Sequence, residues 1–254
     1  MPYMTIENDI RLYYTDAGEG KALVFIHPPG MGSNVFAQQQ ALTANFRVVT
    51  YDMRGNGKSS ASNKPITISL LTEDLHQLLR SLQIERAIIC SYSSGGSVAQ
   101  AFALRYPEQT EAIVLIGGFP EVRTLWLYFE FLLGIFTAKI GAISLLAKVL
   151  GTAHGKSQDE KRAIERYARL ANQKDLFSMY KTMLHDRNTE HLAKLTVPLL
   201  IIYGNRDYYL HAYETTFKTY VPHARAIYID KARHQIPTRH ADELNAILTS
   251  YFLP

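Results

Sequence analysis

The sequence has a single cysteine, Cys90, among its 254 residues. An intrachain disulfide needs two cysteines and a multi-cysteine zinc site needs more, so both are excluded. A strong excess of one charge is also lacking, since 27 lysines and arginines oppose 23 aspartates and glutamates. The densest basic cluster, at residues 156–169, contains acidic residues too, which is typical of a solvated helix face. A nucleic-acid partner is therefore not predicted, because such proteins concentrate their cations on one face.

Long uncharged hydrophobic runs are absent as well. The most apolar stretch, residues 122–150, is interrupted by four charges, which leaves uncharged runs of at most 8 residues. A membrane-spanning helix needs about 18 apolar residues or more. The N-terminal residues lack the apolar core of a signal peptide. With 47% hydrophobic and 20% charged residues, the composition is that of an ordinary globular protein, and we expect it to be soluble and cytoplasmic.

Short apolar runs rich in β-branched residues recur along the chain and predict strands. Several are uninterrupted, such as LVFI and AIIC, as expected of strands covered on both faces. Helix-period segments lie between them, at residues 69–82, 94–106 and 240–252. This alternation predicts an α/β fold, with a mostly parallel eight-stranded sheet flanked by helices and an antiparallel hairpin at one edge. The expected strands are residues 3–7, 12–15, 23–27, 47–51, 87–91, 112–116, 199–203 and 226–229.

One segment breaks this alternation. Residues 121–196 form a helical pattern of 76 residues between two predicted strands. A structureless connection of that length is uncommon inside a compact domain. We therefore predict a helical cap (lid) subdomain at 121–196, inserted into a core domain that consists of residues 1–120 and 197–254.

A serine lies at the turn between a predicted strand and a predicted helix. The segment Ser91-Tyr92-Ser93-Ser94-Gly95 follows the pattern G-x-S-x-G, with a serine in place of the first glycine. In this motif a strained turn projects the central serine hydroxyl above the sheet. The N–H groups at the start of the following helix favour a developing negative charge. Ser93 is therefore the candidate nucleophile.

Five short segments lie at the ends of the third, fourth, fifth, seventh and eighth predicted strands: HPPGMGS, YDMRGNGKS, SYSSGG, GNRD and RHQIP. In this order they resemble the α/β-hydrolase superfamily, over nearly the whole length of the chain. The resemblance implies an α/β-hydrolase fold with a serine nucleophile and requires neither a metal nor an organic cofactor. The set of motifs is specific for the superfamily and says little about the substrate.

Serine is a weak nucleophile at neutral pH and needs a base. His234 lies in the loop after the last predicted strand, where the resemblance places the catalytic histidine. Asp207 lies just beyond the seventh strand, where the resemblance places the acid that orients that histidine, and the chain order Ser…Asp…His fits. The nearest alternatives are His240 as the base and Glu121 as the acid.

The loop that should help to hold an oxyanion departs from the family pattern. The resemblance assigns one N–H donor to Ser94 and the other to the position of Pro29, which has no N–H. Losing one donor typically lowers the rate by about 10²- to 10³-fold. We therefore predict that the N–H of Gly30 or Met31 supplies the missing donor.

The predicted reaction is hydrolysis of carboxylic esters through an acyl-enzyme on Ser93. The first half of the cap is unusually apolar and aromatic, which favours small to medium hydrophobic substrates over charged ones, because ligand pockets are lined mainly by apolar groups. The candidate substrate-binding residues are His27, Tyr92, Trp126 and Phe129.

Three alternatives use the same residues. The first is hydrolysis of a lactone or a carbon–carbon bond, because HPPGMGS and RHADELN resemble segments of ring-cleavage-product hydrolases. The tryptophan that those enzymes tend to carry after the catalytic histidine is missing here, since the only tryptophan is Trp126. The second is perhydrolysis or acyl transfer, in which peroxide or an alcohol intercepts the acyl-enzyme. The third is a ligand-binding sensor that retains the three residues. The sequence does not fix the oligomeric state.

Overall fold

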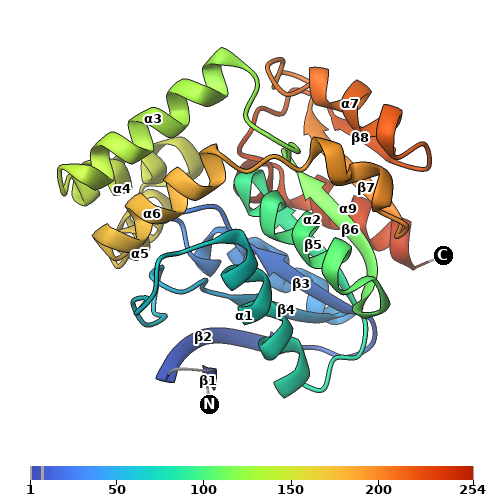
Figure 1. Ribbon diagram of the computed structural model, residues 1–254, viewed down its shortest axis with the longest axis horizontal. Helices are drawn as coiled ribbons and strands as arrows, with labels where there is room; N and C mark the ends of the chain where they lie inside the picture. The colour runs from blue at the N-terminus through green and yellow to red at the C-terminus, as the bar shows by residue number, and fades with distance from the viewer. Residues whose placement is uncertain (1, 7–8, 254) are drawn as a thin grey trace.

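The computed structural model describes residues 2–6 and 9–253 and shows one eight-stranded sheet in the order β1-β2-β4-β3-β5-β6-β7-β8 (Figure 1). The predicted α/β fold is confirmed, and each predicted strand has its counterpart. Residue 7, the expected end of the first strand, lies outside the described residues. The strands are β1 (Tyr3–Ile6), β2 (Ile10–Ala17), β3 (Ala22–Ile26), β4 (Arg47–Tyr51), β5 (Ala87–Tyr92), β6 (Thr110–Ile116), β7 (Leu199–Gly204) and β8 (Arg225–Ile229).

The first two strands form the antiparallel edge that the sequence predicts. β1 pairs antiparallel with β2, and β2 pairs antiparallel with β4. The pairs from β4 through β3, β5, β6 and β7 to β8 are all parallel. Because the carboxyl ends of parallel strands meet at one edge of the sheet, the loops after β3, β5, β7 and β8 lie together there.

Helices cover both faces of the sheet, which explains the uninterrupted apolar strands. Neighbouring residues of β3 point to opposite faces: Val24 packs in one buried cluster and Phe25 in the other. The first cluster contains apolar side chains of α1, α2 and α7, and the second contains those of η2 and α9. These elements are η2 (Ser33–Ala44), α1 (Ile68–Ser81), α2 (Gly96–Arg105), α7 (Ala212–Tyr220) and α9 (Ala241–Phe252).

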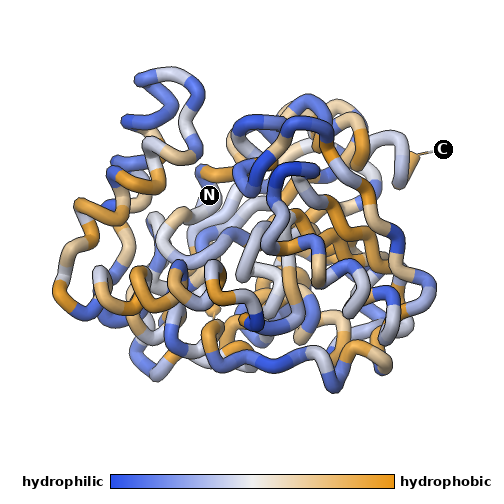
Figure 2. The backbone as a smooth tube through the Cα atoms, turned by 90° about the horizontal axis from the view of Figure 1, so that it is seen from above, coloured by the Kyte–Doolittle hydropathy of each residue, from blue (hydrophilic) through white to orange (hydrophobic). Residues whose placement is uncertain are grey.

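The segment between β6 and β7 contains helices α3 (Leu125–Lys139), α4 (Ile143–His154), α5 (Gln158–Ala168) and α6 (Gln173–Leu184). They lie together on one side of the molecule, at the left in Figure 1. Hydrophobic positions fill the central strands and continue along these helices (Figure 2). Among the described residues, no helix has the length and apolarity that crossing a bilayer requires.

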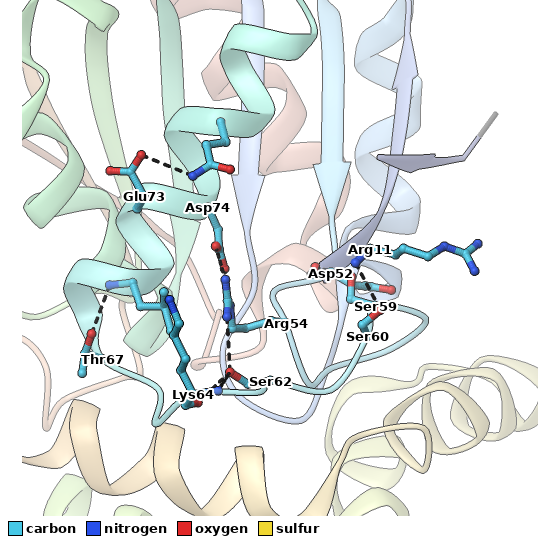
Figure 3. Close-up of polar contacts among 12 residues, drawn as sticks. Arg11, Asp52, Arg54, Ser59, Ser60, Ser62, Lys64, Thr67, Glu73 and Asp74 are labelled. Atoms are coloured by element: carbon cyan, nitrogen blue, oxygen red, sulfur yellow. Dashed lines mark hydrogen bonds and ion pairs between the residues drawn. The ribbon is translucent and has the colours of Figure 1, made fainter. Parts of the chain in front are cut away.

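A buried ion pair fixes the loop after β4. The Arg54 guanidinium donates to both carboxylate oxygens of Asp74 on α1, at 2.6 and 2.5 Å, and its third nitrogen lies 3.3 Å from Ser62 Oγ (Figure 3). Both charged side chains are 3% exposed. A bidentate pair of this kind is geometrically specific. The loop beside the oxyanion segment is therefore tied to the core of the protein.

Candidate active site

The turn after β5 holds Ser93 in a strained conformation. Ser93 has φ of 52°, in the left-handed region that non-glycine residues rarely adopt. It opens the short helix η3 (Ser93–Gly95), which leads into α2. A Cβ atom at Gly95 would lie 2.7 Å from the backbone oxygen of Ile26, so a larger residue would push the two segments apart. Ser91, which replaces the first glycine of the motif, is buried and its Oγ lies 3.3 Å from the Val114 carbonyl oxygen.

Three side chains from separate loops form one chain of hydrogen bonds. His234 Nε2 lies 2.9 Å from Ser93 Oγ, and His234 Nδ1 lies 2.8 Å from Asp207 Oδ2. Asp207 follows β7 and is 2% exposed, whereas His234 follows β8 and is partly accessible. The structure thus brings together the three residues that the sequence singled out. This order of contacts is the one in which a carboxylate orients a histidine that can take a serine proton.

The two alternative residues have other partners. His240 Nδ1 lies 3.1 Å from Glu243 Oε1, one turn along α9. Glu121 forms an isolated bridge with Arg187 and lies 3.5 Å from the Arg123 guanidinium. No contact of either residue with the Ser93–His234 pair is found among the described residues. Asp207 and His234 therefore remain the candidate acid and base.

In the loop after β3, the N–H groups predicted to be oxyanion donors have hydrogen-bond partners within the protein. Pro28, Pro29, Gly30 and Met31 form a tight turn in which Gly30 has φ of +81° and the Met31 N–H donates to the Pro28 carbonyl oxygen at 3.4 Å. Proline followed by a positive-φ glycine is the pattern of a type II turn. The Gly30 N–H is also taken, because it donates to Asn56 Oδ1 at 2.8 Å. The prediction is therefore wrong for Gly30, whereas the Met31 N–H is directed weakly at the Pro28 carbonyl oxygen within the turn.

A cavity of about 230 Å³ opens above Ser93. Its floor includes Ser93, Ser94 and Tyr92, and its roof comes from α3, α4 and α6. Pro29 and Met31 line it as well, so the predicted oxyanion loop does border the site. The apolar residues of its roof are Leu127, Phe131, Leu133, Gly134, Leu146, Val149, Leu150 and Ala153.

Two predicted substrate contacts on the inserted helices are wrong. Trp126 and Phe129 are 72% and 58% exposed and do not line the cavity, whereas Leu127 and Phe131 on the same helix do. Successive residues of a helix differ by about 100° in direction, so Trp126 and Phe129 can face solvent although they lie next to residues that line the cavity. Because α3 is apolar on nearly all sides, its hydrophobic pattern did not indicate which side faces the cavity.

The predicted contact at His27 is also wrong. This residue is fully buried. Its Nδ1 lies 2.8 Å from the Pro28 carbonyl oxygen, and its Nε2 accepts from the Met53 N–H at 2.9 Å. Both ring nitrogens therefore hold the loops after β3 and β4 together, and neither can contact a substrate. Tyr92, by contrast, lines the cavity, and its ring centroid lies 5.2 Å from that of His234.

Four polar residues of the cavity were missed by sequence reasoning: Glu130 on α3, His154 at the end of α4, Tyr180 on α6 and Gln235 next to His234. Glu130 is a single charged residue within the apolar sequence of α3, and this pattern could have indicated a cavity residue. Burial raises the pKa of the Glu130 carboxyl, and the nearby His234 only partly opposes this shift. No sequence pattern distinguishes His154 or Tyr180 from ordinary helix residues.

Among residues 2–6 and 9–253, no group of three or more histidine, cysteine, aspartate and glutamate side chains could hold a metal ion.

A family model described as serine aminopeptidase, S33, matches residues 21–238, which is most of the chain. The chain belongs to this family and is an α/β-hydrolase. A curated relative, 3-oxoadipate enol-lactonase 2 of Acinetobacter baylyi, is 32% identical over 110 residues, which cover 42% of this hydrolase and 41% of the relative.

Solved structures show the same fold along the full chain. An enol-lactonase from Burkholderia xenovorans LB400 superimposes with a TM-score of 0.86 at 23% identity, covering 100% of both chains. An esterase from Exiguobacterium antarcticum superimposes with a TM-score of 0.87 at 18% identity, covering 98% of both chains. At these identities the likeness establishes the fold of the hydrolase, and the substrate has to be argued from its own site.

Burial of His154 gives the hydrolase a predictable acid sensitivity. Burial lowers the pKa of this imidazole to about 3, and the nearby His234 and Arg239 add to the effect. Below an unfolded-state pKa of about 6.5 the unfolded chain binds a proton that the folded protein does not, so acid favours unfolding. We expect His154 to contribute a loss of up to about 1.4 kcal/mol in unfolding free energy per pH unit between pH 6.5 and 3.

Urea unfolding of wild type and His154→Gln at pH 7, 6 and 5 measures this contribution. The variant should lose stability less steeply with falling pH than wild type does. His185→Gln is the matched control, because the His185 ring is exposed. Identical slopes for wild type and His154→Gln would contradict the prediction.

Proposed function

We propose that this hydrolase cleaves carboxylic esters of small to medium hydrophobic substrates through an acyl-enzyme on Ser93. The observation that carries the proposal is the hydrogen-bonded chain Ser93–His234–Asp207 at the floor of a mainly apolar cavity. An activated serine, its base and an orienting carboxylate are the parts that acyl transfer requires.

The reaction follows from these contacts. Ser93 Oγ adds to the ester carbonyl carbon as its proton passes to His234 Nε2, and the carbonyl electron pair moves onto oxygen. The tetrahedral intermediate collapses with loss of the alkoxide, which takes the proton from His234. Water then attacks the acyl-enzyme, with His234 again accepting and returning a proton. Asp207 keeps Nδ1 protonated and stabilises the imidazolium in both halves of the reaction.

We infer that residues 121–196 act as a lid over this site. Helices α3, α4 and α6 supply the roof of the cavity, and the roof is mostly aliphatic and aromatic. Such a lining favours hydrophobic acyl or alcohol groups, since apolar surface gains free energy when it leaves water. The proposed substrate is accordingly a small molecule whose part in contact with the roof of the cavity carries no charge.

Glu130 sharpens the expected charge preference. This residue is exposed to solvent and also lines the cavity. An anionic substrate group near it would therefore meet a carboxylate. Because burial raises the pKa of Glu130 above its usual range, the repulsion should grow as the pH rises through that elevated pKa. Neutral esters are therefore expected to react faster than anionic ones at neutral pH.

A panel of p-nitrophenyl esters tests the substrate class and the role of Glu130 together. Wild type should hydrolyse butyrate and hexanoate esters with a higher kcat/KM than a hemisuccinate ester. In Glu130→Gln the preference for neutral over anionic esters should shrink by about tenfold, as expected from losing one Coulombic repulsion in a partly screened site. Glu190→Gln, an exposed residue outside the cavity, is the control. Equal turnover of neutral and anionic esters by wild type would contradict the proposal.

A second candidate is hydrolysis of amino-acid esters or amides. The specific observation that favours it is again Glu130, since a carboxylate in an apolar cavity can pair with a substrate ammonium group. The panel therefore includes alanine p-nitroanilide. Preference for this amine over the neutral esters in wild type, lost in Glu130→Gln, would favour the second candidate.

A further inference from the structure

The oxyanion site lacks a donor on the side of the loop after β3. Pro29 has no N–H. The Gly30 N–H is bonded to Asn56, and the Met31 N–H is directed back into the turn at the Pro28 carbonyl oxygen, 3.4 Å away. On the other side, the Ser94 N–H belongs to the first turn of η3, where N–H groups have no partner within the helix. A hole with one backbone donor would be slower by about 10²- to 10³-fold than a hole with two.

One cavity side chain hydrogen-bonds to this loop. The Tyr180 hydroxyl, presented by α6, donates to the Pro29 carbonyl oxygen at 3.4 Å. This distance lies beyond the usual O–H···O range, so the hydroxyl is only weakly held. The ring is fixed against α3: it meets Phe131 edge-on, with centroids 6.1 Å apart, and a Cβ at Gly134 would lie 2.6 Å from its Cε1.

We propose that the Tyr180 hydroxyl is the second oxyanion donor of this hydrolase, in place of the N–H that Pro29 cannot supply. The proposal rests on the ester hydrolysis proposed above. Rotation about the Cζ–Oη bond would turn the hydrogen from the Pro29 carbonyl oxygen into the cavity that Ser93 and Ser94 also line, while the ring stays packed. Burial raises the pKa of this phenol, so the hydroxyl keeps its proton at neutral pH.

Two other polar side chains of the cavity, His154 and Tyr92, are less suited to this role. His154 Nδ1 lies 3.3 Å from Thr238 Oγ1, and its ring packs edge-on against Tyr92. The Tyr92 hydroxyl is completely enclosed by protein. Among the described residues that line the cavity, Tyr180 is the one whose side chain bonds to the oxyanion loop.

The first test is Tyr180→Phe, assayed on p-nitrophenyl butyrate. We expect kcat to fall by about 10²- to 10³-fold with KM changed less than threefold, because the donor acts on charge that develops after binding. Affinity for a trifluoromethyl ketone, which forms an oxyanion on Ser93, should fall in parallel. Tyr128→Phe is the matched control, because Tyr128 lies on the exposed side of α3 and outside the cavity.

The decisive test restores the backbone donor. Pro29→Ala returns an N–H to position 29, so the double variant Pro29→Ala/Tyr180→Phe should regain at least tenfold in kcat over Tyr180→Phe. A purely structural role of Tyr180 would give no such rescue. The proposal is overturned if Tyr180→Phe retains kcat within threefold of wild type, or if the second substitution restores nothing. Failure of the proposed ester hydrolysis mechanism has a different signature, because the activity would then survive replacement of Ser93.

Discussion

Replacing Ser93 with alanine is expected to lower kcat toward a neutral ester by about 10⁴- to 10⁶-fold. The hydroxyl that lies 2.9 Å from His234 Nε2 is then gone, and no acyl-enzyme can form. The residual activity is then direct attack of water on the bound ester, which the oxyanion donors and binding in the cavity still accelerate. Steady-state assays of wild type and Ser93→Ala purified side by side measure the loss.

Two further variants make this result specific. His234→Ala in the Ser93→Ala background should cost little more, because the two residues act as a unit. Ser93→Gly should be as inactive as Ser93→Ala but about 1 kcal/mol more stable, since glycine adopts the left-handed conformation without strain. Full activity in Ser93→Ala would refute the central assignment.

The kinetics also separate an enzyme from a ligand-binding sensor. Wild type should turn over many equivalents of ester, with a rapid burst when hydrolysis of the acyl-enzyme is the slow step. A single slow turnover followed by tight binding would favour the sensor. Added peroxide or alcohol that increases the rate would indicate perhydrolysis or acyl transfer.

Asp207→Asn is expected to lower kcat by about 10⁴-fold while leaving the fold intact. Asparagine fills nearly the same space, but its amide can present an N–H to His234 Nδ1 and favour the tautomer that cannot accept the serine proton. It also removes the negative charge that stabilises the imidazolium. Rates measured from pH 6 to pH 9, together with thermal melting, separate this effect from unfolding.

A neighbouring carboxylate provides the control for Asp207. Asp230 accepts from Asn205 Nδ2 at 2.9 Å in the same group of loops and is exposed. Asp230→Asn should therefore change kcat less than threefold. If Asp207→Asn behaves like Asp230→Asn, Asp207 does not orient the base and another acid must do so.

The elements that sequence predicted well are those whose signals are local. The uninterrupted apolar strands, the small residues around Ser93 and the long helical segment after β6 each carry a pattern within a few residues of themselves. Asp207 and His234 follow predicted parallel strands, as Ser93 does. Because parallel strands bring their carboxyl ends to one edge of the sheet, the three residues could be predicted to lie together. The resemblance to α/β-hydrolases then assigned the roles of Ser93, Asp207 and His234.

The details that sequence missed depend on contacts between distant segments. The Gly30 N–H is taken by Asn56, and Tyr180 approaches Pro29 across 151 residues of chain. No pattern near Pro29 indicates either contact. Along α3 the apolar residues continue around the helix, so the side facing the cavity was set by packing against α6 and not by a hydrophobic stripe.

The outward position of Trp126 has a spectroscopic consequence. It is the only tryptophan of the chain, it is 72% exposed, and it lies on the side of α3 away from the cavity. Selective tryptophan excitation therefore reports on helix α3 without any added label. A bound substrate would not contact the indole, so a change in its emission during turnover would record displacement of α3 and could be timed against formation of the acyl-enzyme.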